Sequence, residues 1–372
     1  MLGNKVLIIS YGFPPDIGGT EVVAYDYAVN LALLGYQVSV VCCRCRDRER
    51  YKQIEIIEFP NLFGKKFWML NYYLFLKRIN YNKYDYIILN QSNTPGVVGR
   101  IFRKKEFDKC ITIIQGLEVE WFYKNHRLLS NIFNNYIFRL KKYHKKTLCN
   151  SRKIVAVSNA HKHKVLSAAH LENLSSKVQV VYTGIDKDVF HKVNNTYRDK
   201  YKLNNCQLLF SVSRIVAMKG YAKMLNIFKM LCLKDPTFHW MIAGDGPYLS
   251  ELKAKVMDES LSEHVTFLGN VERNSLKIYY SIADCFWLLS DYDECLPLVY
   301  LEAQACGTPA IGRNKGGVVE TIIDNKTGFL VNSDEECLGI LLHRKYEQLK
   351  SEDLKSFTDK FDKIEAARQL IS

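Results

Sequence analysis

Short apolar runs that alternate with longer helical patterns constrain the fold of this chain more than any other feature. Such runs are typical of strands that are buried on both faces of a parallel sheet. Their alternation with helical segments predicts an α/β protein with doubly wound sheets, in which helices cover both faces. The runs form two series, one at 5–10, 37–42, 86–90, 110–114, 153–157 and 178–182, the other at 208–213, 239–243, 265–268 and 285–289.

The length of the chain predicts two domains. Its 372 residues are more than twice the roughly 150 residues of a typical domain, and with 48% hydrophobic residues each half can build a core. The polar stretch 186–205 separates the two series. We therefore expect Rossmann-like domains over 1–190 and 191–351. Because ligands bind outside the carboxyl ends of the strands in such folds, we expect these ends to face a central cleft.

The segment 291–309 carries two carboxylates around a predicted helix start. Pro297 suits the first helical position, because its missing N–H costs nothing there. The free amides of Leu298 and Val299 would then form an anion site. Glu302 lies one turn after Leu298 on the same helical face, so its carboxylate can reach a ligand held at that helix start. A nucleoside diphosphate presents both groups that this arrangement favours, phosphates and then ribose hydroxyls.

Several stretches, in this order along the chain, resemble the retaining glycosyltransferases of family 4 (glycosyl transferases group 1), which have the GT-B fold. The segment 291–309 matches their Glu-(seven residues)-Glu signature. The resemblance covers roughly residues 5–332 and implies two Rossmann-like domains, the first on the acceptor side and the second for the donor. It also implies a terminal helix, about residues 352–372, that packs back on the first domain. The other matching stretches are FPPDIGGTE at 13–21, VVYTGID at 180–186, VSR at 212–214 with KG at 219–220, AGDGP at 243–247, and GGVVE at 316–320 with TG at 327–328.

The resemblance assigns catalysis to Arg214, Lys219 and Glu294. The two cations follow a strand end and would stabilise the negative charge that grows on the leaving nucleoside diphosphate. Glu294 would accept hydrogen bonds from the donor sugar, or cap the following helix. Glu302 would bind the ribose hydroxyls, or interact with the helix dipole. None of these residues needs to be a nucleophile. In this family the retained anomeric configuration is generally attributed to attack by the acceptor on the front face of the donor sugar.

Loops supply the remaining expected contacts. Gly18 and Gly19 follow the first strand, where glycines let backbone amides approach phosphate. Asp245, in the turn after Gly244, would shape the nucleotide-base pocket. Gln115 stands where many relatives carry His and cannot change charge near neutral pH, so either that His is dispensable or donor selectivity differs. Gln115 is a sugar-pocket candidate together with Glu118, which could instead be a surface carboxylate.

Neither a metal nor a cofactor is expected. Asp291-Tyr292-Asp293 has D-x-D spacing, but it directly precedes the helix start, which favours a loop role. Cys42 and Cys45 have C-x-x-C spacing without a second Cys or His pair at metal-site spacing, which favours the end of a buried strand. The 11 Cys form no framework and no signal peptide opens the chain, so we expect reduced thiols and a cytoplasmic protein.

The formal net charge of +13 is partly concentrated in the first domain. The stretch 121–153 is rich in Lys, Arg and aromatic residues and contains no Asp or Glu, and 63–78 is similar. Such stretches suit an anionic bilayer surface, although they could be ordinary helices with buried aromatics. The longest apolar stretch, 67–76, is too short to span a bilayer. We expect peripheral association with the inner face of the cytoplasmic membrane and, without a recognition motif, no nucleic acid.

Together these features predict a metal-independent hexosyltransferase. It would move a sugar from a UDP- or GDP-sugar to a glycan or lipid-linked glycan acceptor, in bacterial cell-surface polysaccharide biosynthesis (lipopolysaccharide, O-antigen, capsule or exopolysaccharide). Two alternatives are a non-catalytic nucleotide-sugar-binding protein of the same fold and a GT-B nucleotide-sugar epimerase. The cation and carboxylate positions are all occupied by suitable residues, which favours the transferase.

Overall fold

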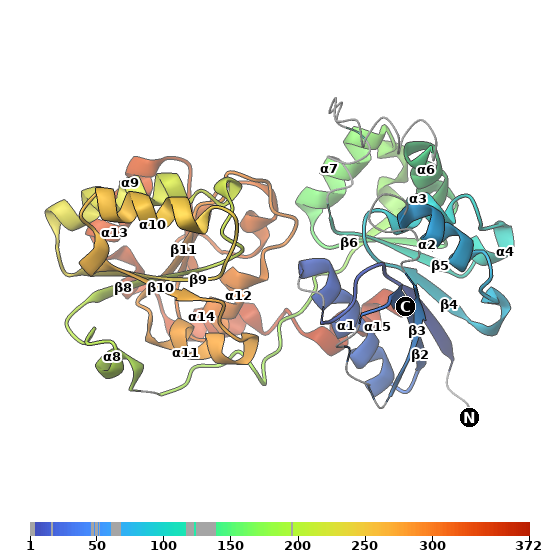
Figure 1. The fold of residues 1–372 in the computed structure, drawn as a ribbon, viewed down its shortest axis with the longest axis horizontal. Coiled ribbons are helices and arrows are strands. Elements are labelled where there is room, and N and C mark those ends of the chain that lie inside the picture. Colours follow the sequence, from blue (N-terminus) through green and yellow to red (C-terminus); the bar gives the residue numbers. More distant parts are fainter. Residues whose placement is uncertain are drawn as a thin grey trace. The chain divides into compact units, whose positions relative to one another are not determined.

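The computed structural model of the chain divides into two compact units (Figure 1). Unit 1 comprises Met1–Thr183 and Lys363–Ser372, and unit 2 comprises Gly184–Asp362. We expected the boundary between the domains after residue 190. The structure divides earlier, after Thr183, and Phe190 is already buried in the core of unit 2. The residues that the structure describes are 4–15, 18–45, 48, 51, 53–60, 68–116, 123, 139–194 and 196–372.

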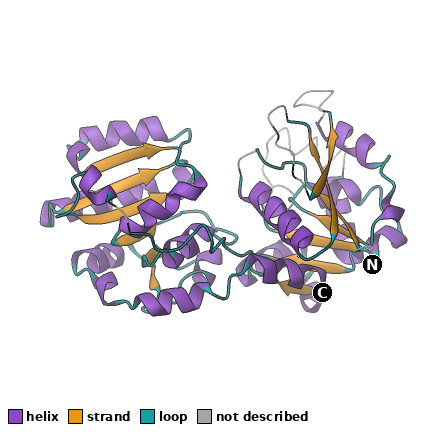
Figure 2. Ribbon diagram, turned by 90° about the horizontal axis from the view of Figure 1, so that it is seen from below, coloured by secondary structure: helices purple, strands orange, loops and turns teal. Residues whose placement is uncertain are grey.

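Unit 1 is built on a seven-stranded parallel sheet with the order β3-β2-β1-β4-β5-β6-β7. Its strands are apolar and buried, as in β5, where every residue is buried, and helices cover both faces (Figures 1 and 2). The strands are β1 (Lys5–Ile9), β2 (Gln37–Cys43), β3 (Ile54–Phe59), β4 (Tyr86–Leu89), β5 (Cys110–Ile114), β6 (Lys153–Ala156) and β7 (Val178–Val180), and the helices include α1 (Gly19–Leu33), α2 (Trp68–Leu76), α3 (Thr94–Val98), α4 (Lys104–Phe107), α6 (Leu140–Asn150) and α7 (Asn159–Ala169).

Unit 2 has a six-stranded parallel sheet with the order β10-β9-β8-β11-β12-β13. The rings of Trp240 and Trp287 meet at its centre, with centroids 4.9 Å apart, and Ser211 Oγ accepts a hydrogen bond from Trp240 Nε1 at 2.9 Å. The strands are β8 (Gln207–Val212), β9 (Phe238–Ala243), β10 (Val265–Gly269), β11 (Cys285–Leu288), β12 (Ala310–Arg313) and β13 (Gly328–Val331), and the helices are α8 (Tyr197–Lys200), α9 (Tyr221–Lys234), α10 (Leu249–Asp258), α11 (Leu276–Ile282), α12 (Leu298–Ala305), α13 (Asp334–Leu342) and α14 (Ser351–Thr358).

The predicted fold class is confirmed, since both sheets are parallel and Rossmann-like. Each predicted run is a strand whose ends differ by at most two residues from the prediction. Three further strands, β3, β12 and β13, were missed. The edge strand β3 reads IEIIEF, and its Glu residues interrupt the apolar pattern. β12 and β13 have only four residues each, and each contains a Gly.

The C-terminal segment forms two helices, where the sequence predicted one over about 352–372. α14 packs against α12 within unit 2, and the chain then extends, with Phe361 O accepting from Ile185 N at 3.0 Å. α15 (Lys363–Ile371) lies against α1 in unit 1. There Lys363 Nζ pairs with Asp26 Oδ1 at 2.7 Å.

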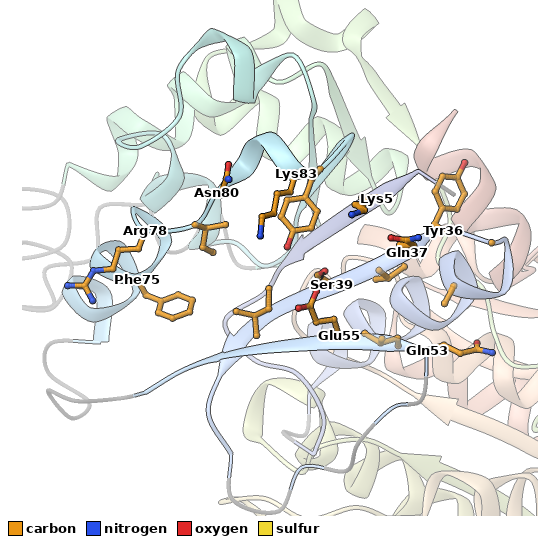
Figure 3. A pocket seen from close by; sticks show the side chains of 17 residues that line it. Lys5, Tyr36, Gln37, Ser39, Gln53, Glu55, Phe75, Arg78, Asn80 and Lys83 are labelled. Atoms are coloured by element: carbon orange, nitrogen blue, oxygen red, sulfur yellow. Dashed lines mark hydrogen bonds between the residues drawn. The ribbon is translucent and has the colours of Figure 1, made fainter. Parts of the chain in front are cut away.

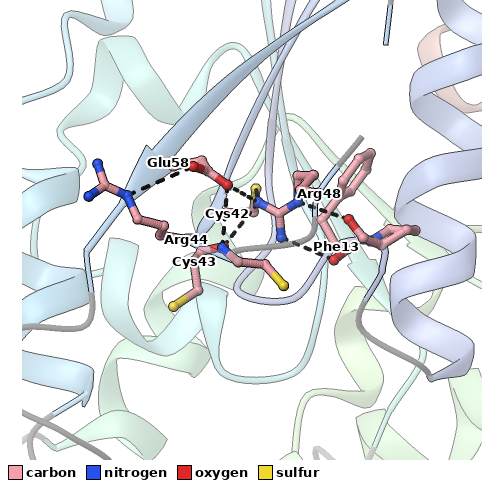
Figure 4. A network of polar contacts seen from close by, with 8 residues as sticks. Phe13, Cys42, Cys43, Arg44, Arg48 and Glu58 are labelled. Carbon is pink, nitrogen blue, oxygen red and sulfur yellow. Dashed lines mark hydrogen bonds and ion pairs between the residues drawn. The ribbon is translucent and has the colours of Figure 1, made fainter. Parts of the chain in front are cut away.

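A buried arginine fixes the segment that follows β1 (Figure 4). The Arg48 side chain is 4% exposed and pairs with Glu58 Oε1 at 2.7 Å. Its Nε donates to Pro14 O at 2.8 Å and its Nη2 to Phe13 O at 3.2 Å. Arg48 also contacts Cys42 at the end of β2, whose Sγ accepts from Nη1 at 2.8 Å. The guanidinium thus holds the start of the FPPDIGGTE stretch against β2 and β3.

Candidate functional site

Unit 2 brings together most of the predicted site residues at the carboxyl ends of three neighbouring strands. Arg214 and Lys219 follow β8, Gly244 and Asp245 follow β9, and Glu294 follows β11. β8 lies between β9 and β11 in the sheet. This is the edge at which parallel α/β sheets bind ligands.

The start of α12 differs by one residue from the prediction. Pro297 is the N-cap, in an extended conformation with φ −80° and ψ 101°, and the first helical residue is Leu298. Pro fixes only φ, and the extended ψ here delays the helix by one position. Within the described residues, no group accepts a hydrogen bond from the backbone N–H of Leu298 or Val299. These amides therefore have no acceptor within the described chain, and their role as an anion site stays a prediction.

Lys219 and Glu294 form an ion pair, with Nζ and Oε1 2.5 Å apart and side chains 20% and 11% exposed. The loops that carry them are joined by the backbone, since Asp291 N donates to Met218 O at 2.9 Å. Gly220 makes this approach possible: it has φ +80°, and a Cβ there would lie 2.0 Å from Leu289 O. The structure thus holds a cation and a carboxylate together at this edge of the sheet.

Gly317 supports the Glu294 loop from the other side. Its N–H donates to Glu294 O at 2.7 Å, and a Cβ at this position would lie 2.0 Å from Cys295 O. The D-x-D carboxylates nearby are paired: Asp291 with Lys223 at 2.6 Å and Asp293 with Lys315 at 3.8 Å. In the described part of the chain no cluster of three His, Cys, Asp or Glu residues could hold a metal ion.

Glu302 is buried, with only 2% of its surface exposed. Its Oε1 accepts from Arg273 Nη2 at 2.7 Å and its Oε2 from the Tyr280 hydroxyl at 3.1 Å. Burial, and then the charge of Glu302, raise the pKa of Tyr280 well above its usual value. Arg273, whose guanidinium lies over the ring of Phe190 at 5.1 Å, was not identified from the sequence, because it stands outside every matching stretch.

Arg214 is exposed, and its guanidinium has no hydrogen-bond or ion-pair partner among the described residues. The neighbouring turn is tightly packed. Gly244 has φ +122°, and a Cβ there would lie 2.0 Å from Ser213 O. Asp245 Oδ1 accepts from Gly246 N at 2.7 Å. The Asp245 side chain therefore stabilises the turn after Gly244, and its expected part in a nucleotide-base pocket stays a prediction.

Unit 1 places Gly18, Gly19 and Gln115 at the carboxyl edge of its own sheet. Gly18 is the N-cap of α1 and Gly19 its first residue. Gln115 is buried and its Nε2 donates to Asn90 Oδ1. Glu118 lies outside the described residues.

The same edge contains Glu21, Asn90 and Gln91, which the sequence analysis did not single out. Asn90 Nδ2 donates to Ser10 Oγ at 3.0 Å, and Gln91 Nε2 donates to Glu21 Oε1 at 2.7 Å. The signal available in the sequence was the polar pair Asn90-Gln91 directly at the end of an apolar strand.

A cavity of about 1020 Å³ opens at the opposite edge of this sheet (Figure 3). Lys5, Gln37 and Ile54, the first residues of β1, β2 and β3, line it together with Arg78 and Tyr84. It contains none of the predicted site residues. No described helix is long and apolar enough to cross a membrane.

Comparison with known proteins gives the family. The model for Glycosyltransferase Family 4 matches residues 17–189, and the model for Glycosyl transferases group 1 matches residues 193–338. The chain is 31% identical over 170 residues to a GDP-mannose-dependent alpha-(1-6)-phosphatidylinositol monomannoside mannosyltransferase of Mycolicibacterium smegmatis, a match that covers 43% of this chain and 44% of that enzyme. The chain thus spans less than half the length of this curated relative.

Two further similarities cover more of the chain. It is 28% identical over 272 residues to an uncharacterized 41.2 kDa protein in the cps region of Klebsiella pneumoniae, which covers 70% of this chain and 68% of that protein. The crystal structure of Anabaena HepE in complex with UDP superposes with a TM-score of 0.76 at 16% identity, covering 98% of both chains. The fold and the two family matches together show that the chain belongs to the GT-B glycosyltransferases of the group 1 and family 4 type.

Proposed function

We propose that the protein is a retaining, metal-independent hexosyltransferase that uses a nucleotide-sugar donor, UDP- or GDP-linked. The observation that carries the proposal is the edge of unit 2 at which the Lys219–Glu294 pair, the Arg214 guanidinium and the α12 amides gather. Cations and free amides suit a diphosphate, and a neighbouring carboxylate suits sugar hydroxyls. The names of the relatives support the donor class, since one enzyme depends on GDP-mannose and one structure contains UDP.

In the proposed reaction the bond between the anomeric carbon and the diphosphate oxygen breaks, and the acceptor oxygen forms a bond to the same face of that carbon. The acceptor proton passes to the departing phosphate oxygen. Arg214, Lys219 and the amides of Leu298 and Val299 stabilise the charge that develops on the diphosphate. Lys219 would then exchange part of its contact with Glu294 for phosphate, which frees Glu294 to accept from the donor sugar.

Glu302 is proposed to accept hydrogen bonds from the donor ribose. Arg273 and Tyr280 use one lone pair on each carboxylate oxygen, and an ionised carboxylate has further lone pairs to offer. Asp245 and Gly244 would shape the base pocket, Gly18 and Gly19 would lie near the phosphates, and Gln115 and Glu118 near the sugar.

The proposed acceptor is a lipid-linked saccharide of bacterial cell-surface polysaccharide assembly, such as lipopolysaccharide, O-antigen, capsule or exopolysaccharide. The cps-region relative and the phosphatidylinositol monomannoside substrate named for the mannosyltransferase support this choice. The protein would be cytoplasmic and would associate peripherally with the inner face of the cytoplasmic membrane. Unit 1 would make the contact with the membrane.

The surface formed by α2 and α6 supports membrane docking. Leu70 and Leu74 of α2 are 37% and 40% exposed, and neither helix contains Asp or Glu. Arg100 links the two helices, because its guanidinium lies over Tyr73 of α2 at 5.5 Å and Tyr143 of α6 at 5.3 Å. Exposed apolar side chains beside cations suit an anionic lipid surface, where each cation contributes about 1 kcal/mol.

The test is acceptor-dependent release of UDP from UDP-glucose or GDP from GDP-mannose. The acceptor probes are diacylglycerol, phosphatidylinositol and undecaprenyl-diphosphate-linked N-acetylglucosamine, each in phosphatidylglycerol vesicles. Transfer to at least one probe with retained anomeric configuration supports the proposal. Nucleotide binding without turnover would favour the non-catalytic alternative, and an epimerised donor in the absence of acceptor would favour the epimerase.

A further inference from the structure

Glu21 occupies an unusual position in unit 1. It lies in the first turn of α1, directly beside the carboxyl ends of β1 and β4, and it is half-buried. Its hydrogen-bond partners in the described chain are neutral: Oε1 accepts from Gln91 Nε2 at 2.7 Å and Oε2 from Thr20 Oγ1 at 2.9 Å. Within the described chain no Lys or Arg pairs with it. Glu294 and Glu302 in unit 2, by contrast, each have a cation partner.

Two glycines leave the space that this carboxylate fills. A Cβ on Gly12 would lie 2.6 Å from Glu21 Oε1, and a Cβ on Gly18 would lie 2.1 Å from Glu21 Oε2. Any side chain at either position would require the carboxylate to move. Gly19, by contrast, has open space around its missing Cβ. The FPPDIGGTE stretch therefore contains a glycine that makes room for its own glutamate.

Gln91 holds the carboxylate from the other side. It has φ +71°, a left-handed conformation that is uncommon for residues other than Gly, Asn and Asp, and it is only 9% exposed. Its Oε1 accepts from Gly12 N at 3.1 Å while its Nε2 donates to Glu21. Buried residues in sparsely populated backbone conformations cluster at functional sites, because the surrounding contacts must compensate the strain.

The carboxylate still has capacity for a ligand. Each carboxylate oxygen has two lone pairs, and the protein uses one on each. Carboxylate oxygens that have no cation partner accept hydrogen bonds, and the hydroxyl groups of a saccharide donate them, so the two kinds of group match. Asn90 and Gln115 extend the same network with further amide groups.

We infer that Glu21 hydrogen-bonds a hydroxyl of the acceptor saccharide and that Gln91 is the positioning residue that aims it. This inference rests on the proposed function and assigns the acceptor side of that reaction to named residues. Glu21 orients the acceptor and takes no proton, because the departing phosphate accepts it. Selectivity for acceptors that present a hydroxyl at this point follows from the charge of Glu21.

The first test is Glu21→Gln, which preserves size and most hydrogen bonds but removes the charge. We expect kcat/KM for the fastest of the three acceptor probes to fall at least about tenfold, since hydrogen bonds to a charged group are the stronger ones. UDP or GDP binding and the melting temperature should stay at wild-type values. The matched control is Glu55→Gln, which also removes a carboxylate bonded to a hydroxyl, Ser39 Oγ at 2.6 Å, but at the opposite edge of the sheet. It should leave the acceptor kinetics unchanged.

The second test is Gln91→Glu, which separates positioning from a merely structural role. An ionised carboxylate at position 91 repels Glu21, whereas its protonated form can donate to Glu21 as the amide does. Acceptor kcat/KM relative to wild type should therefore rise severalfold as the pH falls from about 8 to about 5.5, with no such trend in Glu55→Gln.

The outcomes separate the two proposals. Unchanged acceptor kinetics in Glu21→Gln, with nucleotide binding intact, would overturn the role of Glu21. A pH-independent defect in Gln91→Glu would overturn the positioning role of Gln91. Failure of the wild-type protein to bind UDP or GDP would instead contradict the proposed donor site.

Discussion

At the scale of single residues, the two carboxylates of the glycosyltransferase signature differ in their surroundings. Glu294 lies beside one lysine near the surface, whereas Glu302 is buried and holds Arg273 and Tyr280 together. Substitution of Glu302 therefore tests stability as well as activity, and the two effects must be measured separately.

We expect Glu302→Ala to lower the free energy of unfolding by about 3 kcal/mol, because it leaves Arg273 and the buried Tyr280 hydroxyl without their acceptor. Glu302→Gln should cost less, since the amide oxygen still accepts one hydrogen bond. Urea unfolding of both variants measures this difference. Equal stability of the alanine variant and the wild type would show that the buried contact is not formed.

His239 gives a pH dependence of stability. Burial, and then the charge of His264, lower its pKa from 6.5 to about 4. The unfolded chain therefore binds more protons than the folded chain between these values, and stability is lost as the pH falls through this window. The largest loss is about 3 kcal/mol. We expect the urea midpoint of the wild type to fall between pH 7 and pH 4, and that of His239→Gln to fall clearly less. The same decrease in both proteins would contradict the lowered pKa of His239.

At the scale of elements, the site depends on loops that follow strands, and these were less predictable than the strands. The apolar runs located β1, β2 and β4–β11, because burial on both faces favours a largely uninterrupted apolar sequence. The Glu21–Gln91 contact joins segments 70 positions apart, and no local pattern reports such a pairing. The same holds for Arg273 and Glu302, and for the buried Arg48. Family resemblance supplied the cations and carboxylates of unit 2, which spacing alone would not have distinguished from surface charges.

Substitution of Gly220 tests how the loop that carries Lys219 is positioned. Gly220→Ala places a Cβ 2.0 Å from Leu289 O at a left-handed φ, so the turn must move away from the end of β11. We expect a loss of stability of roughly 1–3 kcal/mol and a larger proportional loss of turnover than in Gly339→Ala, whose Cβ would meet open space. Wild-type turnover in Gly220→Ala would show that the turn need not touch β11.

At the scale of the whole molecule, the chain crosses from unit 2 back to unit 1 to place α15 beside α1. This connection was expected only from resemblance, and the break between α14 and α15 was not predicted, because the charged sequence there reads as continuously helical. The positive charge of the molecule bears on a different property, its proposed attachment to membranes.

We expect the protein to co-sediment with phosphatidylglycerol vesicles and to be released as salt rises from about 50 to about 500 mM, because screening weakens surface attraction. Lys141→Glu combined with Lys145→Glu on α6 should weaken binding severalfold. Lys345→Glu combined with Lys350→Glu, at two exposed lysines of unit 2, is the matched control because it changes the net charge by the same amount. Binding that ignores salt, or equal binding of all variants, would exclude the α2 and α6 surface as an electrostatic docking site.

The central claim is that Arg214 and Lys219 bind the departing diphosphate at the carboxyl edge of the sheet in unit 2. The most direct measurement is acceptor-dependent nucleotide release by Lys219→Ala and Arg214→Ala, each checked for a wild-type melting temperature. We predict a decrease of at least about tenfold in kcat for each variant, as expected when one stabilising charge is removed from the transition state. Wild-type rates in both folded variants would contradict the account.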